Sequence, residues 1–91
     1  MKQLDMLAIA NFAKGNVGWG ISGDKLRKVY QFTAYQDGLN FTVKVASLAE
    51  KMNHHPDVLL GYNEVTVLLM THDAGGITQL DLDLAQEIEK L

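Results

Sequence analysis

The hydrophobic and polar positions along the chain change period several times, and each change predicts a new secondary-structure element. Residues 2–13 have the spacing of an amphipathic helix, which Gly15 is placed to end. The apolar face of this helix is expected at Leu4, Leu7, Ala8 and Phe12. Shorter periods then predict a hairpin, with strands over 19–22 and 25–32 and a turn at Gly23-Asp24. The basic cluster Lys25, Arg27 and Lys28 is expected on the solvent face of the second strand.

Helical periodicity returns in the middle of the chain. Thr33 and Gln36 have the spacing of a capping box, which predicts a helix over 34–52. Its apolar positions are Phe41, Val45, Leu48 and Met52. This helix must end before Pro56, because proline disfavours helical geometry at the residue before it. Two strands are expected next, over 57–61 and 64–71, joined by a tight turn at residues 62–63.

The last predicted element is a helix that follows the turn in "DAGG". Thr78 is expected to cap it, with Asp81 completing a capping box and Ile77 packed against Leu82. The buried stripe of this helix is expected at Leu80, Leu84, Ile88 and Leu91. The whole order, α-β-β-α-β-β-α, has no crossover long enough to require parallel strands. The sequence therefore predicts an α+β two-layer sandwich, a four-stranded antiparallel sheet with helices packed on one face, as a single domain over 1–91.

The strand over 64–71 is apolar on both faces, and this affects the expected assembly. Leu68 and Met70 point away from the helices, so the apolar surface that they leave is expected to be a subunit contact or a pocket wall. We also expect this strand to be an unpaired edge in a monomer, and unpaired apolar edges promote association. The sequence therefore predicts an obligate homo-oligomer, with a dimer as the minimum unit.

Composition and charge narrow the classes of partner. A net charge of −3 with scattered basic residues argues against a nucleic-acid surface, which requires clustered Lys and Arg. The absence of cysteine excludes disulfides, thiol catalysis and Cys-based zinc sites. No signal sequence is recognisable, and no apolar run approaches the ~20 residues that span a bilayer. We therefore expect a cytoplasmic protein that binds neither nucleic acid nor membrane directly.

The candidate chemistry lies in the three histidines of the chain. His54 and His55 follow the predicted end of the middle helix, and His72 ends the adjoining strand, so antiparallel pairing would gather all three at one end of the sheet. Three interpretations are open: surface or capping histidines, a three-His zinc site, and acid–base catalysis on an organic substrate. The zinc interpretation is the weakest, because adjacent histidines are poorly spaced to chelate one ion.

A resemblance to a known family separates these interpretations. The segments "EKMNHHPDVLLGYNEV" and "THDAGGIT", with the final "LDLA" helix, resemble the pterin-4a-carbinolamine dehydratase family from about residue 17 onwards. The matching residues are Glu50, His54, His55, Pro56, Tyr62, Thr71, His72, Asp73 and Gly76, together with Trp19, Phe32 and Asp81. The chain departs from the family at Val58, where many members have tryptophan, and this puts the affinity for substrate in doubt.

The resemblance implies an enzyme that removes water from 4a-hydroxytetrahydrobiopterin to give the quinonoid dihydropterin, with neither metal nor cofactor. It implies acid–base work for His54 and His72, and positioning of the pterin by His55. The positions implied for substrate binding are Glu50, Asp81, Trp19, Pro56, Thr71 and Asp73. For four of these the residues themselves leave a structural role open: a solvated carboxylate at Glu50, a cap at Asp81, a core side chain at Trp19 and a helix stop at Pro56.

The resemblance also bears on partners. It implies a homodimer or homotetramer that binds a pterin substrate, with a possible protein partner in the pathway of aromatic amino-acid hydroxylases. Some relatives of the family act as dimerisation partners of a transcription factor, and others assist enzyme assembly. A non-catalytic protein-binding module on the same fold is therefore the alternative function, although such a module has no need of three histidines.

Overall fold

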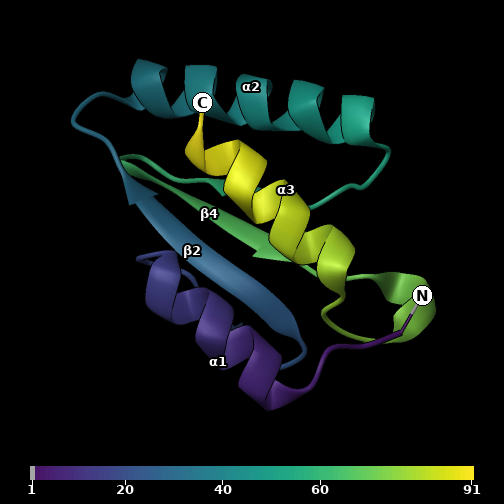
Figure 1. Ribbon diagram of the computed structural model, residues 1–91. Helices are drawn as coiled ribbons and strands as arrows, with labels where there is room; N and C mark the ends of the chain where they lie inside the picture. Colours follow the sequence, from purple (N-terminus) through teal and green to yellow (C-terminus); the bar gives the residue numbers. More distant parts are fainter. Residues whose placement is uncertain (1) are drawn as a thin grey trace.

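The structure, a computed structural model, describes residues 2–91 and has the predicted order of helices and strands (Figure 1). The elements are α1 (Met6–Gly15), β1 (Gly20–Ser22), β2 (Lys25–Gln31), α2 (Tyr35–Met52), β3 (Asp57–Leu60), β4 (Glu64–Leu69), the short 3-10 helix η1 (His72–Ala74) and α3 (Gln79–Glu89). No helix within the described residues is long and apolar enough to cross a membrane.

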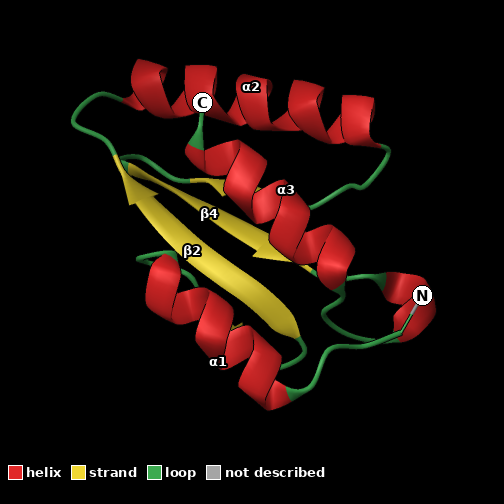
Figure 2. Cartoon of the chain, in the orientation of Figure 1, coloured by secondary structure: helices red, strands yellow, loops and turns green. Residues whose placement is uncertain are grey.

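All neighbouring strands of the sheet are antiparallel, in the order β1-β2-β4-β3. The helices cover one face of this sheet, as the two-layer prediction requires (Figure 2). β4 is a central strand, with Leu69 opposite Leu26 of β2 and Leu68 opposite Asp57 of β3. The expectation that β4 would be an unpaired edge is therefore wrong, and the edges of the sheet are β1 and β3.

The core lies between the sheet and the helices. β2 and β4 contribute Leu26, Val65, Val67 and Leu69, all at 0% exposure. Their partners from the helices include Ile9, Val45, Ala49, Leu82, Leu84, Ala85 and Ile88. Full burial of one such aliphatic side chain stabilises the fold by roughly 1.5–3 kcal/mol. Because the apolar residues recur with period 2 in the strands and 3.6 in the helices, they face one another and form this core.

The first and last helices differ from the predicted faces. α1 begins after Asp5, whose carboxylate accepts the Ala8 N–H, and it buries Ile9 while Leu7 is 70% exposed. The predicted capping box of α3 is confirmed, but its predicted stripe is wrong at two positions, because Leu80 is 37% and Leu91 48% exposed. Leu80 lies in the first turn, beyond the core, and Leu91 lies past the end of the helix.

The start of α2 and the face of Lys28 are two further corrections. Ala34 is the N-cap of α2 and makes no side-chain capping bond, so the predicted Thr33 cap is wrong. Lys28 lies on the same face of β2 as Leu26, towards the helices. Its Nζ donates to Glu89 Oε1 at 2.8 Å and Oε2 at 2.9 Å, so the Lys28 ammonium is paired with a carboxylate although it points towards the helices.

Candidate active site

The turn after α2 separates the two adjacent histidines. Asn53 ends the helix in a left-handed conformation (φ 52°, ψ 41°), which asparagine adopts more readily than most residues. Its backbone N–H bonds the carbonyl groups of the last helical turn. The chain leaves the turn extended towards Pro56, so the side chains of His54 and His55 reach different carboxylates.

His54 is held by a buried carboxylate on α3. Its Nε2 lies 2.5 Å from Asp81 Oδ1, and the side chains are 12% and 0% exposed. The other oxygen, Oδ2, accepts the Thr71 hydroxyl and the Thr78 backbone N–H, both at 2.9 Å. Every contact to the carboxylate is therefore from a donor, which leaves the Nε2–H tautomer of His54 as the one that fits.

Two threonine hydroxyls continue this network behind Asp81. The oxygens of Thr71 and Thr78 lie 2.8 Å apart, and both side chains are buried. Because the single proton of the Thr71 hydroxyl is donated to Asp81, its oxygen must accept the proton of the Thr78 hydroxyl. The chain of bonds thus has one direction, from Thr78 through Thr71 to Asp81, and it fixes the carboxylate that orients His54.

His55 has a different environment. Its Nε2 lies 2.7 Å from Glu50 Oε1, but the two side chains are 61% and 79% exposed. A contact between an imidazole and a carboxylate that are both open to solvent contributes little energy and restrains its partners weakly. His55 can therefore change position at small cost, whereas His54 cannot.

His72 is presented by a short loop that β4 and α3 hold at both ends. Thr71 and Gly76 pair through their backbones, with Thr71 N–H to Gly76 O at 2.9 Å, and Gly75 closes the turn with φ 73°. His72 begins η1 and is exposed.

These segments enclose a pocket of ≈ 280 Å³ at one end of the sheet. Its lining residues are Asn53, His54, His55, Met70, Thr71, His72, Asp73 and Leu80. The predicted gathering of the three histidines is confirmed in this geometry. Of Leu68 and Met70, predicted to form a subunit contact or a pocket wall, Met70 lines the pocket and Leu68 does not. Asn53 and Leu80 are lining residues that the sequence did not single out, since one was treated as a helix end and the other as core.

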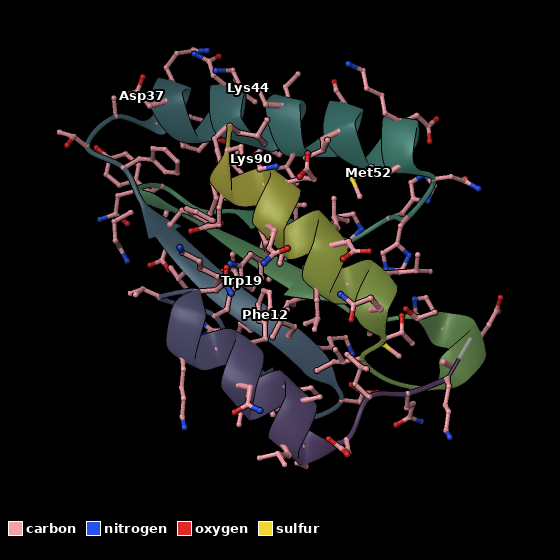
Figure 3. All side chains as sticks on the ribbon, in the orientation of Figure 1. Phe12, Trp19, Asp37, Lys44, Met52 and Lys90 are labelled. Carbon is pink, nitrogen blue, oxygen red and sulfur yellow. The ribbon has the colours of Figure 1, made fainter. Side chains whose placement is uncertain are left out.

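Four residues that the resemblance placed at the substrate are not in this lining. Asp81 lies behind His54, and Glu50 reaches the site only through His55. Pro56 follows the histidines on the way into β3. Trp19 is 4% exposed in the core, edge-on to Tyr30 at 6.4 Å between ring centroids, and Figure 3 shows it among the side chains that fill the space between helices and sheet.

Larger hollows elsewhere lack this chemistry. A broad depression of ≈ 600 Å³ on α2 is lined by Val43, Ala46, Ser47, Glu50 and Lys51. It contains no imidazole. Within residues 2–91, no three His, Cys, Asp or Glu side chains are placed to share a metal ion. The pocket with three imidazoles is the candidate active site because imidazole is the side chain best suited to acid–base chemistry, and the depression on α2 has none.

Comparison with known proteins supports the resemblance found in the sequence. Proteins provisionally named as pterin-4-alpha-carbinolamine dehydratases, from Sulfurisphaera tokodaii and Thermomicrobium roseum, are 44% and 42% identical, and each match covers 100% of this chain and 98% of the relative. A crystal structure described as a transcriptional coactivator/pterin dehydratase from Brucella melitensis superposes with a TM-score of 0.90 at 27% identity, covering 98% of this chain and 97% of that one. The family model for pterin 4 alpha carbinolamine dehydratase matches residues 2–91, and the chain belongs to that family.

Proposed function

We propose that this protein is a 4a-hydroxytetrahydrobiopterin dehydratase, which removes water from pterin-4a-carbinolamine to give the quinonoid dihydropterin. The observation that carries the proposal is the pairing of two unlike imidazoles on one pocket: His54, oriented by a buried carboxylate, and His72, exposed on a short loop. Acid–base chemistry at neutral pH needs one group that donates a proton and one that accepts it, and two imidazoles can supply both.

The reaction asks for two proton transfers. The hydroxyl at C4a leaves as water after it receives a proton, and the proton on N5 is removed as the C4a–N5 double bond forms. One imidazole of the His54–His72 pair donates the first proton and the other accepts the second. After one turnover the two rings have exchanged protonation states, so exchange with solvent must reset them, and the openness of the pocket at His72 permits this.

The remaining residues support binding and orientation. Nε2–H of His54 is bonded to Asp81, which leaves Nδ1 to exchange protons with the substrate. We assign pterin positioning to His55 with Glu50, and a contact at the pocket rim to Asp73. The Thr71 hydroxyl is committed to Asp81, so its role is to position that carboxylate. Pro56 directly precedes β3, and its role is to restrict the backbone between α2 and that strand.

The test is a dehydration assay with synthetic carbinolamine and no added metal. General acid–base help is worth about 10²–10⁴-fold per group, so His54→Ala and His72→Ala should each lose about that much while retaining the far-UV circular dichroism of the wild type. Gln86→Ala, an exposed change on α3, is the matched control and should keep full activity. Full activity in either histidine variant, or loss of wild-type activity with a chelator, would contradict the mechanism.

We further infer that the chain works in the cytoplasm as a homo-oligomer. The lack of cysteine is consistent with a reducing compartment. What supports assembly is the outer α2 face, defined by Tyr35, Leu39 and Val43, which are 48%, 37% and 57% exposed at i, i+4, i+8 spacing. The same face supports the alternative function, a protein-binding module. A chain that assembles through this face but fails to accelerate dehydration would favour the module.

A further inference from the structure

The segment before α1 lies against the outside of the loop that carries His72. Leu4 donates its backbone N–H to Ile77 O at 2.8 Å, and Gln3 Nε2 donates to Ala74 O at 2.7 Å. Figure 1 shows this start of the chain beside η1. Two segments 71 residues apart in the sequence are thus joined next to the pocket, at a place where the pocket lining itself does not reach.

Gly76 is fitted to the same side chain. A Cβ on Gly76 would lie 2.8 Å from Gln3 Oε1 and 2.9 Å from its Cδ, so the flexible end of the Gln3 side chain would have to move. The Gln3 carboxamide therefore packs directly over the Gly76 backbone while its nitrogen bonds Ala74. The hydrogen bond from Gln3 to Ala74 therefore depends on glycine at position 76, because a methyl group there would displace the Gln3 amide.

This contact matters for His72 because it is the side-chain bond from the start of the chain to the loop, beside the backbone bond from Leu4 to Ile77. η1 is a single three-residue turn, too short to be stable without tertiary contacts. Among the described residues, no hydrogen bond to the His72 ring itself is present, so the ring's place depends on the backbone that carries it. That backbone is tied at Thr71 to Gly76 and, through Ala74, to Gln3.

We propose that Gln3 is a positioning residue for His72: its carboxamide, packed on Gly76, holds η1 in the place from which His72 faces the pocket. The effect on the loop stands on the contacts alone, whereas the effect on catalysis rests on the proposed function. Gln3 does not touch the pocket, and it acts only through Ala74 and Gly76.

Gln3→Glu is the sharpest single change, since it keeps the shape but replaces the donor by an acceptor that repels the Ala74 carbonyl. One hydrogen bond has a net value of about 0.5–1.5 kcal/mol, which is roughly a 2–13-fold change. Amide exchange at 74–77 should accelerate by about that factor, the ring resonances of His72 should shift, and kcat should fall several-fold with KM little changed. Lys2→Ala, the exposed neighbour, is the control and should change none of these.

A double-mutant cycle separates this contact from a general loosening of the loop. Gln3→Ala and Gly76→Ala should each accelerate amide exchange at 74–77 and lower kcat by similar factors. The double variant should change both no more than Gly76→Ala alone, because the contact is broken only once. Additive losses, or unchanged exchange and His72 resonances in Gln3→Glu, would overturn the proposal. Faster amide exchange at 74–77 and shifted His72 ring resonances, with kcat unchanged, would overturn the positioning role. If the wild type shows no dehydration, the proposed function fails, and exchange and resonances still decide whether Gln3 holds His72.

Discussion

At the residue scale, the two adjacent histidines are paired with carboxylates of opposite environment. Asp81 is fully buried and receives donors on both oxygens, whereas Glu50 is largely exposed. Electrostatic interactions strengthen as solvent is excluded, so the His54 pair is rigid and the His55 pair is not. The roles that we propose for these sequence neighbours differ accordingly: His54 as a fixed proton-transfer group and His55 as an adaptable binding group.

His55 tests this difference directly. His55→Ala should chiefly weaken pterin binding, raising KM more than it lowers kcat, because an exposed ring that only positions substrate contributes equally to the ground and transition states. Steady-state kinetics on the carbinolamine measure the split, and Glu50→Gln should show the same pattern to a smaller degree. A kcat loss as large as that of His54→Ala, at constant KM, would reverse the assignment.

Thr71 tests the network behind His54. Thr71→Val removes a buried hydroxyl of nearly the same shape and leaves Asp81 Oδ2 short of a donor, which should lower the free energy of unfolding by about 1–3 kcal/mol and reduce kcat. Thr71→Ser keeps the hydroxyl and should retain most of both. Urea unfolding and the dehydration assay give the two quantities, with Thr66→Val as a buried control away from the pocket. Equal kcat in the Val and Ser variants would show that the hydroxyl has no orienting role.

Much of the site could be predicted from local residue types, and the parts that could not depend on tertiary placement. His-His-Pro and Thr-His mark the candidate proton-transfer groups, and antiparallel pairing brings them to one pocket. Nothing local distinguishes Leu80 from a core leucine, since it lies one helical turn before Leu84. The commitment of the Thr71 hydroxyl to Asp81 likewise appears only once the start of α3 is placed beside the end of β4.

At the scale of elements, the far end of α3 is tied to β2 by a charged cluster. Glu89 accepts from Lys28 and from the Tyr30 hydroxyl, and Lys28 also donates to Val17 O at 2.9 Å. Burial raises the pKa of Glu89, but the hydrogen bonds from Lys28 and Tyr30 and the Lys28 charge outweigh it, so the pKa lies below its ordinary value. Burial and the Glu89 contact raise the pKa of Tyr30.

The sign of the pH effect follows from these directions. A carboxyl group whose folded pKa is depressed stabilises the fold above its ordinary value of 4.5, and this contribution is lost as pH falls through the folded pKa. Glu89→Gln should therefore reduce the free energy of unfolding by about 1 kcal/mol at pH 7, and the difference from the wild type should shrink as pH falls through the folded pKa of Glu89. Urea titrations at a series of acidic pH values measure the difference.

Glu87→Gln is the matched control for that experiment. Glu87 pairs with Lys90 at 2.7 Å on the exposed surface of the same helix, with the side chains 42% and 72% exposed. Such pairs contribute roughly 0–1 kcal/mol, so its loss should be smaller than that of Glu89. A Glu89 loss no larger than the Glu87 loss would mean that the cluster does not hold α3 to the sheet.

The elements themselves were largely predictable, and the failures have physical causes. Hydrophobic period defined the helices and strands because burial dominates their packing. Lys28 was placed on the wrong face because its partner, Glu89, is far along the sequence. The order β1-β2-β4-β3 places the apolar strand β4 between two others, and the local pattern does not specify this order. The expected strand is therefore confirmed, whereas the expectation that it is an unpaired edge is wrong.

At the scale of the whole molecule, two of the places with exposed apolar side chains are the outer α2 face and strand β3. Leu59 of β3 is 58% exposed, and strand β3 has a partner, β4, on one side only. Pairing of β3 edges across a two-fold axis would extend the sheet, and packing of outer α2 faces would join such dimers. This replaces β4 as the basis for expecting an oligomer.

Light scattering at low micromolar concentration tests the assembly. The wild type should give a particle at least twice the 10.1 kDa of one chain. Val43→Lys places a charge in the outer α2 face and should reduce any tetramer to a dimer, whereas Lys44→Glu, also exposed on α2, should not. A folded, active particle of about 10 kDa would contradict the expectation of an oligomer.

Because Asp81 both caps α3 and orients His54, the start of this helix affects how the protein loses activity on heating. The same carboxylate that accepts the Thr78 N–H at the start of α3 orients His54, so fraying of that first turn releases the imidazole in the same event. On the proposed mechanism, a form with this turn frayed should not turn over substrate. On heating, activity should disappear at the rate at which the first turn of α3 opens, and it should return when that turn re-forms.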